Sequence, residues 1–131
     1  VSRVDTQAVG ARAREIIMQT ERNLGFEPTD REIDKLGYDI ESRSPVSGKL
    51  RFIEVKGRVD TADTIMITRQ EVITSLHEPE KFILAIVQVA DGQPTAPRYV
   101  RGSLDTREPP FDQNAIQFNI KRLLERAEVP T

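Results

Sequence analysis

The chain has 131 residues, a formal net charge of −2 and no cysteine. This length suits one domain whose hydrophobic core needs no disulfide or structural metal. The lack of cysteine excludes disulfides, thiol catalysis and Cys-ligated zinc or iron sites. The balance of 19 basic and 21 acidic residues is unlike that of a DNA-wrapping module, although a local basic rim can still bind nucleic acid.

The longest apolar runs, such as residues 82–87, are far shorter than the roughly 20 residues of a membrane span, and the N-terminal residues lack a signal-peptide pattern. We therefore expect an intracellular, cytoplasmic domain. One domain is predicted over residues 1–131, with a core over about 5–90 and a C-terminal extension over 91–131. Because no initiator methionine precedes Val1, the chain is either a trimmed product or a piece excised from a larger protein, and we expect the excised piece.

The first predicted element is a helix over Asp5 to Leu24. Apolar residues recur along it at spacings of three and four, namely Val9, Ala13, Ile16, Ile17, Thr20 and Leu24. Asp5 can cap its start, and Gly25 suits a left-handed C-terminal cap. Glu15 and Glu21 lie off this stripe or at its margin, where a solvated helix face is the ordinary interpretation and a further acid at a functional site is the alternative.

A β-hairpin is predicted over Gly37 to Arg58. Alternating residues around Asp39 form one strand, turn residues follow, and a second apolar strand carries Glu54 and Lys56. These two side chains leave the same face, roughly 6.6 Å apart along the strand. The three polar residues form a possible metal site. Alternatively, Glu54 and Lys56 are a salt-bridged pair on a solvated face, and Asp39 bonds a neighbouring turn.

The remaining elements complete an α/β sandwich. Turn and capping signals place them as follows: a short extended segment over 26–29, a loop over 58–63, a strand over 65–67, a helix opened by the capping box Thr68–Glu71 and stopped by Pro79, a buried strand over 82–89, a candidate strand over 99–101, a surface connection over 102–113 and a helix over 119–128. The element order αβββαβ, plus a C-terminal helix, predicts a mixed central sheet flanked by helices.

These residues carry a resemblance to a known family. An aspartate followed after 14 residues by Glu-Val-Lys resembles the PD-(D/E)xK nuclease signature, and the element order resembles the restriction-endonuclease-like core. More narrowly, the chain is similar to the nuclease-like domain of unknown function found at the C-terminus of the plant protein NO VEIN and in bacterial helicase and defence proteins. Tyr38 stands where the signature has proline. The matching pieces are Val9-Gly10, Glu21-Arg22, Gly37–Ile40, Ile53–Gly57, Thr68–Glu71 and Phe82–Val89.

The resemblance implies roles for individual residues. Asp39, Glu54 and Lys56 would be catalytic, and Asp39, Glu54 and the backbone carbonyl of Val55 would hold Mg²⁺ or Mn²⁺, which prefers oxygen ligands. The ion would polarise phosphoryl oxygens and activate water, and Lys56 would position that water or stabilise charge on the phosphate. The supporting residues would be Glu15 or Glu21 together with Gln70, and Arg58 and Arg69 would contact nucleic acid. For His77, near a helix end, we expect a surface or capping role.

Two functions follow as expectations. In the first, the domain is a magnesium-dependent nuclease that hydrolyses phosphodiester bonds, on DNA delivered by a helicase or other motor in the same parent protein. In the second, it is a catalytically inactive module of the same fold that binds nucleic acid or protein. Retention of Asp39, Glu54 and Lys56 together favours the first function.

Overall fold

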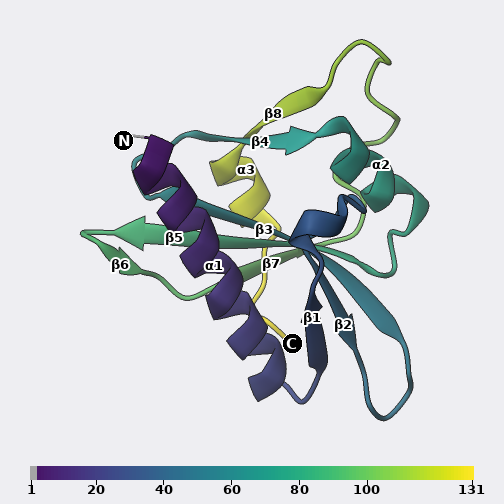
Figure 1. Cartoon of the computed structure of the whole chain (residues 1–131). Helices are drawn as coiled ribbons and strands as arrows, with labels where there is room; N and C mark the ends of the chain where they lie inside the picture. Colours follow the sequence, from purple (N-terminus) through teal and green to yellow (C-terminus); the bar gives the residue numbers. More distant parts are fainter. Residues whose placement is uncertain (1–2) are drawn as a thin grey trace.

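The computed structural model describes the backbone of residues 3–131 and the side chains from Ala8 onward. Its elements are α1 (Arg3–Asn23), β1 (Glu27–Asp30), the 3₁₀ turn η1 (Glu32–Asp34), β2 (Ile40–Arg43), β3 (Leu50–Val59), β4 (Thr64–Thr68), α2 (Arg69–His77), β5 (Phe82–Ala90), β6 (Gln93–Pro94), β7 (Arg98–Arg101), β8 (Ala115–Asn119) and α3 (Ile120–Glu125) (Figure 1). Within residues 3–131, no helix is long and apolar enough to cross a membrane.

The central sheet is mixed, as predicted. Its order is β1-β2-β3-β5-β6, with β7 also paired to β5. The β3–β5 pair is parallel, and the other pairs are antiparallel. Because β3 and β5 run side by side in the same direction, α2 and β4 form the crossover that connects them. This places the predicted hairpin of β2 and β3 beside the most buried strand of the protein.

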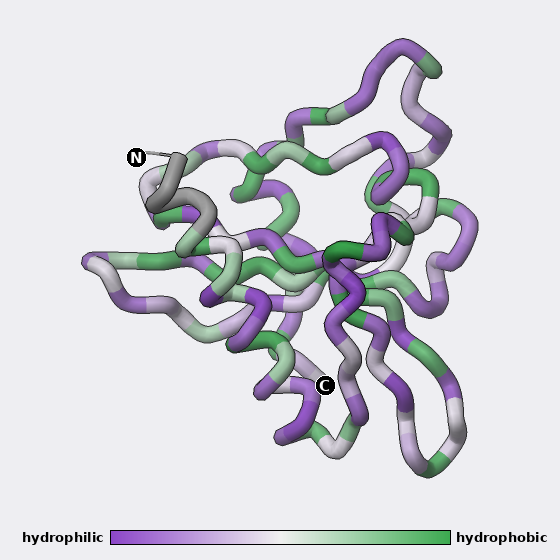
Figure 2. Tube along the Cα trace, viewed as in Figure 1, coloured by the Kyte–Doolittle hydropathy of each residue, from purple (hydrophilic) through white to green (hydrophobic). Residues whose placement is uncertain are grey.

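Three layers enclose two hydrophobic clusters. Side chains of β5 alternate between them: Ile83, Ala85 and Val87 pack with Ala13 and Ile17 of α1. The other face of β5 packs against β4, α2 and α3. In Figure 1, α1 crosses one face of the sheet, while β4, β8 and α3 lie together away from it. Hydrophobic segments gather along the middle of the sheet, and hydrophilic ones along the hairpins and loops at its rim (Figure 2). The buried strand predicted over 82–89 is thus confirmed.

A close approach of α1 to β3 depends on Gly57. A Cβ atom at this position would lie 2.9 Å from the Cβ of Ala13 and 2.9 Å from the main-chain oxygen of Val9. Any side chain here would therefore push the helix off the sheet. The glycine that follows Glu-Val-Lys is explained by this packing contact.

Several predicted details are wrong. The third strand, β4, does not join the central sheet but pairs with β8 in a separate two-stranded sheet, and β8 falls between the predicted surface connection and the last helix. The predicted loop from Arg58 begins two residues too early, since β3 continues to Val59. The final helix, α3, is shorter than predicted and is capped by Asn119. Leu24 is exposed.

The ends of α1 give a mixed result. Gly25 has φ +92° and ends the helix as predicted. Asp5 lies within α1, and the cap predicted there falls on a side chain outside the described part of the chain. Beyond residue 90, the chain supplies Tyr99 to the cluster under α1 and Val100 and Leu123 to the other cluster, so the predicted extension contributes to the core.

Candidate functional site

Asp39 and Glu54 lie next to each other on neighbouring strands. Ile40 pairs with Ile53, so Asp39, one residue earlier, stands beside Glu54. The amide of Asp39 donates to the Ile53 carbonyl at 2.9 Å, and the amide of Val55 donates to Asp39 Oδ2 at 2.9 Å. These bonds fix the Asp39 carboxyl group just before the start of β2, on the sheet face that carries Glu54.

Lys56 joins this pair and adds a third carboxylate. Its Nζ lies 3.1 Å from Glu54 Oε2 and 3.3 Å from Glu71 Oε1. Glu71 belongs to the capping box of α2: its side chain accepts the Thr68 amide at 2.9 Å, while its own amide donates to Thr68 Oγ1 at 3.1 Å. The predicted capping box is confirmed, and its glutamate also faces the site.

The interpretation of Glu54 and Lys56 as a solvated surface pair does not hold. Glu54 is only 2% exposed, and the Lys56 side chain is 22% exposed. Both side chains line an open pocket of about 300 Å³. They are therefore shielded from most of the solvent but can still be reached by a ligand. The lining of the pocket comprises Arg14, Glu32, Lys35, Gly37, Tyr38, Asp39, Glu54, Val55, Lys56, Thr68, Gln70 and Glu71.

Crowded carboxylates perturb each other in this pocket. Burial raises the pKa of Glu54 well above its usual value, and the charges of Glu71 and Asp39 raise it further, against the opposing effect of Lys56. Burial also raises the pKa of Asp39, although its bonds to the Val55 amide and to Glu54 act in the other direction. Burial alone would lower the pKa of Lys56, but Glu54 and Glu71 raise it. Three carboxyl groups, those of Asp39, Glu54 and Glu71, therefore crowd around the ammonium group of Lys56.

Gln70 holds the loop that leads to Asp39. Its Nε2 donates to the Lys35 carbonyl at 3.2 Å. Gly37 has φ +87°, and a Cβ atom there would collide with Thr74 Oγ1 and press on Gln70. The loop therefore packs directly on the first turn of α2, which brings Asp39 and Glu71 to the same pocket.

The two acidic residues expected from the first helix do not reach the pocket. Glu15 is exposed on α1. Glu21 is fully buried, but its Oε2 accepts from Arg51 at 2.7 Å and from the Tyr99 hydroxyl at 2.7 Å. Both partners lie under α1, on the sheet face opposite Glu54. The helix contributes Arg14 to the pocket lining instead.

The predicted nucleic-acid contacts also lie outside the pocket lining. Arg69 donates from Nε to the Pro109 carbonyl at 3.3 Å and stands over the Phe111 ring at 5.7 Å. Arg58 is half-buried on β3. His77 is exposed and pairs with Glu108 at 3.2 Å, in keeping with the surface role expected for it. The cations of the pocket are Arg14, Lys35 and Lys56.

Sequence reasoning missed Glu71 and Arg14 as site residues. Glu71 was identified only as a helix cap, and no spacing in the sequence shows that α2 begins over Lys56. Arg14 stands one residue before Glu15 on a predicted helix, so a rotation of about 100° decides which of them faces the pocket. Both assignments depend on how the helices pack against the sheet.

The chain is similar to known proteins in sequence and in fold. A solved structure of Hjc from Archaeoglobus fulgidus, described as a Holliday junction resolvase from an archaeal hyperthermophile, matches with a TM-score of 0.55 at 9% identity, covering 92% of this chain and 90% of that chain. At this identity the match shows the fold, which is resolvase-like and restriction-endonuclease-like. Among curated proteins, none matches significantly. The family model for the C-terminal region of protein NO VEIN matches residues 9–100, and the chain belongs to that family.

Proposed function

We propose that this domain hydrolyses phosphodiester bonds of nucleic acid with the help of a divalent metal ion. The observation that carries the proposal is the convergence of Asp39, Glu54 and Lys56 in one open pocket, on a nuclease-like fold. A strand hairpin that presents two neighbouring carboxylates and an ammonium group has the donors to bind a cation and a phosphate side by side. Fold alone would not support this proposal, since folds are reused for other functions.

The pocket's donor set fits Mg²⁺ or Mn²⁺. Glu54 Oε1 is buried and accepts no hydrogen bond from the described residues, so this oxygen remains available to a ligand. Asp39 offers a second carboxylate, and the carbonyl of Val55, whose amide binds Asp39, would be the third donor. The described side chains include no cluster of three or more acidic or histidine groups arranged to hold a metal. Two carboxylates, one carbonyl and retained waters are what Mg²⁺ commonly accepts.

The residues of the chain would divide the chemistry between them. When bound, the ion supplies Lewis-acid polarisation and a more acidic water. Asp39 and Glu54 would orient it, and their raised pKa values would fall on its arrival because a positive charge favours both carboxylates. Lys56 would stabilise the charge that develops on the phosphate or position the attacking water. Glu71, tied to Thr68, would keep the ammonium group in place after Glu54 turns to the metal.

The wider assignment also belongs to this proposal. We expect DNA as the substrate, with Arg14 and Lys35 at the pocket in contact with its backbone, and a helicase or other motor in the parent protein to deliver it. Arg58 and Arg69 remain candidate contacts outside the pocket. We expect the protein to act in the cytoplasm. The family resemblance is the support for the motor.

The test is direct. The domain is incubated with single- and double-stranded DNA and RNA in Mg²⁺ or Mn²⁺, next to the variants Asp39→Ala, Glu54→Ala and Lys56→Ala and the exposed control Glu15→Ala. We expect cleavage by the wild type and the control, and none by the three site variants. If wild type and site variants leave every substrate equally intact, and calorimetry detects no metal binding that depends on Asp39 and Glu54, the hydrolysis proposal is refuted. Nucleic-acid binding without cleavage would then favour the inactive module.

A further inference from the structure

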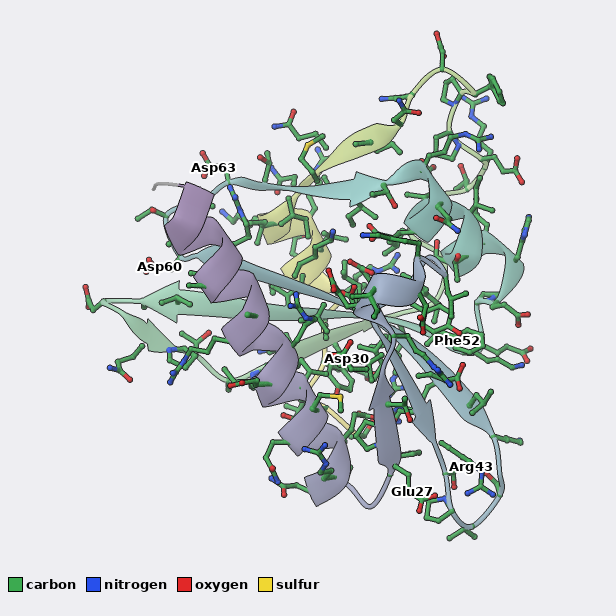
Figure 3. The ribbon with its side chains drawn as sticks, viewed as in Figure 1. Glu27, Asp30, Arg43, Phe52, Asp60 and Asp63 are labelled. Atoms are coloured by element: carbon green, nitrogen blue, oxygen red, sulfur yellow. The ribbon has the colours of Figure 1, made fainter. Side chains whose placement is uncertain are left out.

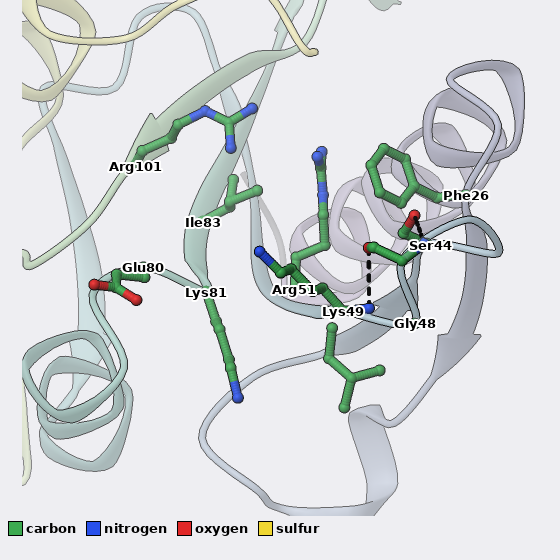
Figure 4. A pocket seen from close by; sticks show the side chains of 11 residues that line it. Phe26, Ser44, Gly48, Lys49, Arg51, Glu80, Lys81, Ile83 and Arg101 are labelled. Atoms are coloured by element: carbon green, nitrogen blue, oxygen red, sulfur yellow. Dashed lines mark hydrogen bonds between the residues drawn. The ribbon is translucent and has the colours of Figure 1, made fainter.

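A second cavity, of about 650 Å³, lies at the turn end of β3 (Figure 4). Four cationic side chains line it, Lys49, Arg51, Lys81 and Arg101, against one acidic residue, Glu80. We call this cavity the basic pocket. Because the whole chain carries a net charge of −2, this gathering of cations is a local feature. Glu128 and Glu78, which pair with Arg101 at 2.6 Å and Lys81 at 3.9 Å, do not line the pocket.

Arg51 is held rigidly in the wall of the basic pocket. Its Nη2 donates to Glu21 Oε2 at 2.7 Å, and its guanidinium group stands 4.2 Å from the centre of the Phe26 ring and 5.6 Å from that of Tyr99. The side chain is 12% exposed. A guanidinium group fixed in this way loses little entropy when it binds a ligand, because its orientation is already set. The buried carboxylate of Glu21 thus anchors this arginine.

Two guanidinium groups converge on one oxygen atom beside the pocket. Arg51 Nη1 and Arg101 Nη2 each donate to the main-chain oxygen of Thr131 at 2.8 Å, and Arg101 Nη2 also donates to Thr131 Oγ1 at 2.9 Å. In Figure 4 both guanidinium groups extend toward the same side of the pocket. Hydrogen bonds between a cation and an anionic oxygen are roughly twice as strong as those between neutral groups. The place where these two guanidinium groups converge therefore favours an anionic oxygen.

An aromatic pair links the basic pocket to the Asp39–Glu54–Lys56 site. The Tyr38 ring, which lines that site, stacks on the Phe52 ring with centroids 4.4 Å apart and planes 14° apart. The ammonium group of Lys81, which lines the basic pocket, lies 5.6 Å from the Phe52 centroid. Phe52 lies on β3 (Figure 3). Aromatic faces between cations are the usual platform for the bases of a nucleic-acid strand.

We propose that the basic pocket binds a backbone phosphate of the same nucleic-acid strand that enters the Asp39–Glu54–Lys56 site, with intervening bases over Tyr38 and Phe52. This inference rests on the proposed function and adds to it a subsite that positions the strand. A phosphate oxygen binds between the guanidinium groups of Arg51 and Arg101, and Lys49 and Lys81 neutralise the neighbouring charge. The ligand class is a phosphodiester strand, and a free mononucleotide carries the same phosphate chemistry without the neighbouring bases.

The test measures binding without cleavage. Labelled single-stranded DNA of about twelve nucleotides is titrated with the full chain in EDTA at several salt concentrations, and binding is followed by fluorescence anisotropy. The variant Lys49→Ala/Lys81→Ala alters two exposed side chains and should leave the fold intact. We expect its affinity to fall by about tenfold and its salt dependence to decrease by about 1.4 in log–log slope, the loss of two phosphate contacts on a single strand. The control Lys121→Ala, exposed on α3, should change neither value.

Two outcomes overturn the inference. Unchanged affinity and salt slope in the double variant would show that the basic pocket does not contact the strand. The second outcome is that thymidine monophosphate displaces the DNA at a concentration similar to that of the DNA strand. This result would show that the basic pocket is a mononucleotide site. Because this assay needs no metal, a wild type that binds through Lys49 and Lys81 but never cuts DNA refutes only the hydrolysis. A wild type that cuts DNA and binds it independently of these lysines refutes only the proposed role of the basic pocket in binding the strand.

Discussion

Replacing Glu54 with glutamine should stabilise the metal-free protein. Glu54 Oε2 and Glu71 Oε1 contact Lys56 Nζ at 3.1 and 3.3 Å, so these oxygens are at most about 6.4 Å apart and repel by at least about 2.6 kcal/mol at an effective dielectric constant near 20. On the same scale Lys56 attracts Glu54 by about 5 kcal/mol. Asp39 adds a second repulsion, and burial of the carboxylate costs several kcal/mol more.

The attraction to Lys56 therefore does not cover the total cost, and Glu54→Gln keeps the shape without the charge. We expect the free energy of unfolding to rise by about 1–3 kcal/mol without metal, which corresponds to roughly 3–12 °C in Tm for a domain of this size. The same variant should lose metal-dependent stabilisation. At a Mn²⁺ concentration of about 100 Kd the wild type gains about 2.7 kcal/mol, whereas the variant gains little.

Thermal unfolding in EDTA and in a Mn²⁺ series measures both effects, with the exposed Glu15→Gln as the matched control. The control should follow the wild type in every condition. A lower Tm for Glu54→Gln in EDTA would show that this carboxylate stabilises the fold, which refutes the charge argument. Equal stabilisation of variant and wild type by Mn²⁺ would remove Glu54 from the set of proposed metal ligands.

Three further predictions concern the rest of the fold. Glu21→Gln removes the buried charge that faces Arg51 and should lower the free energy of unfolding by about 3 kcal/mol in urea, a loss that an exposed role for Glu21 would not produce. Gly57→Ala places a Cβ 2.9 Å from two atoms of α1 and should cost about 1–3 kcal/mol; a neutral result in the same urea assay would disprove the close packing of α1. Burial and the Glu41 carboxylate raise the pKa of Tyr38 to about 12, and burial and Glu21 raise that of Tyr99 further. In the unfolded chain both tyrosines ionise near pH 10, so the unfolded state binds fewer protons above that pH and stability should fall as pH rises from about 10 to 12. Below the raised pKa of Tyr38, tyrosinate absorbance should appear only with unfolding, and a normal titration near pH 10 in the folded protein would contradict this prediction.

The sequence by itself determined the local elements and the part of the candidate site that the hairpin carries. The apolar run of β5 on both faces predicted a central strand, the Thr68–Glu71 pattern predicted the start of α2, and turn residues predicted the hairpin. Spacing of two along β3 placed Glu54 and Lys56 on one face. These features depend on backbone periodicity and on hydrogen bonds between near neighbours, which a sequence specifies directly.

Only the tertiary structure decided which other residues accompany them. Glu21 and Glu71 are both acidic residues on helices, yet Glu21 packs under α1 against Arg51 and Glu71 reaches Lys56. The pairing of β4 with β8 joins segments about fifty residues apart, and no local pattern encodes it. Helix rotation, crossover position and long-range strand pairing follow from packing of the whole core, because many contacts of similar energy compete and only their sum selects one arrangement.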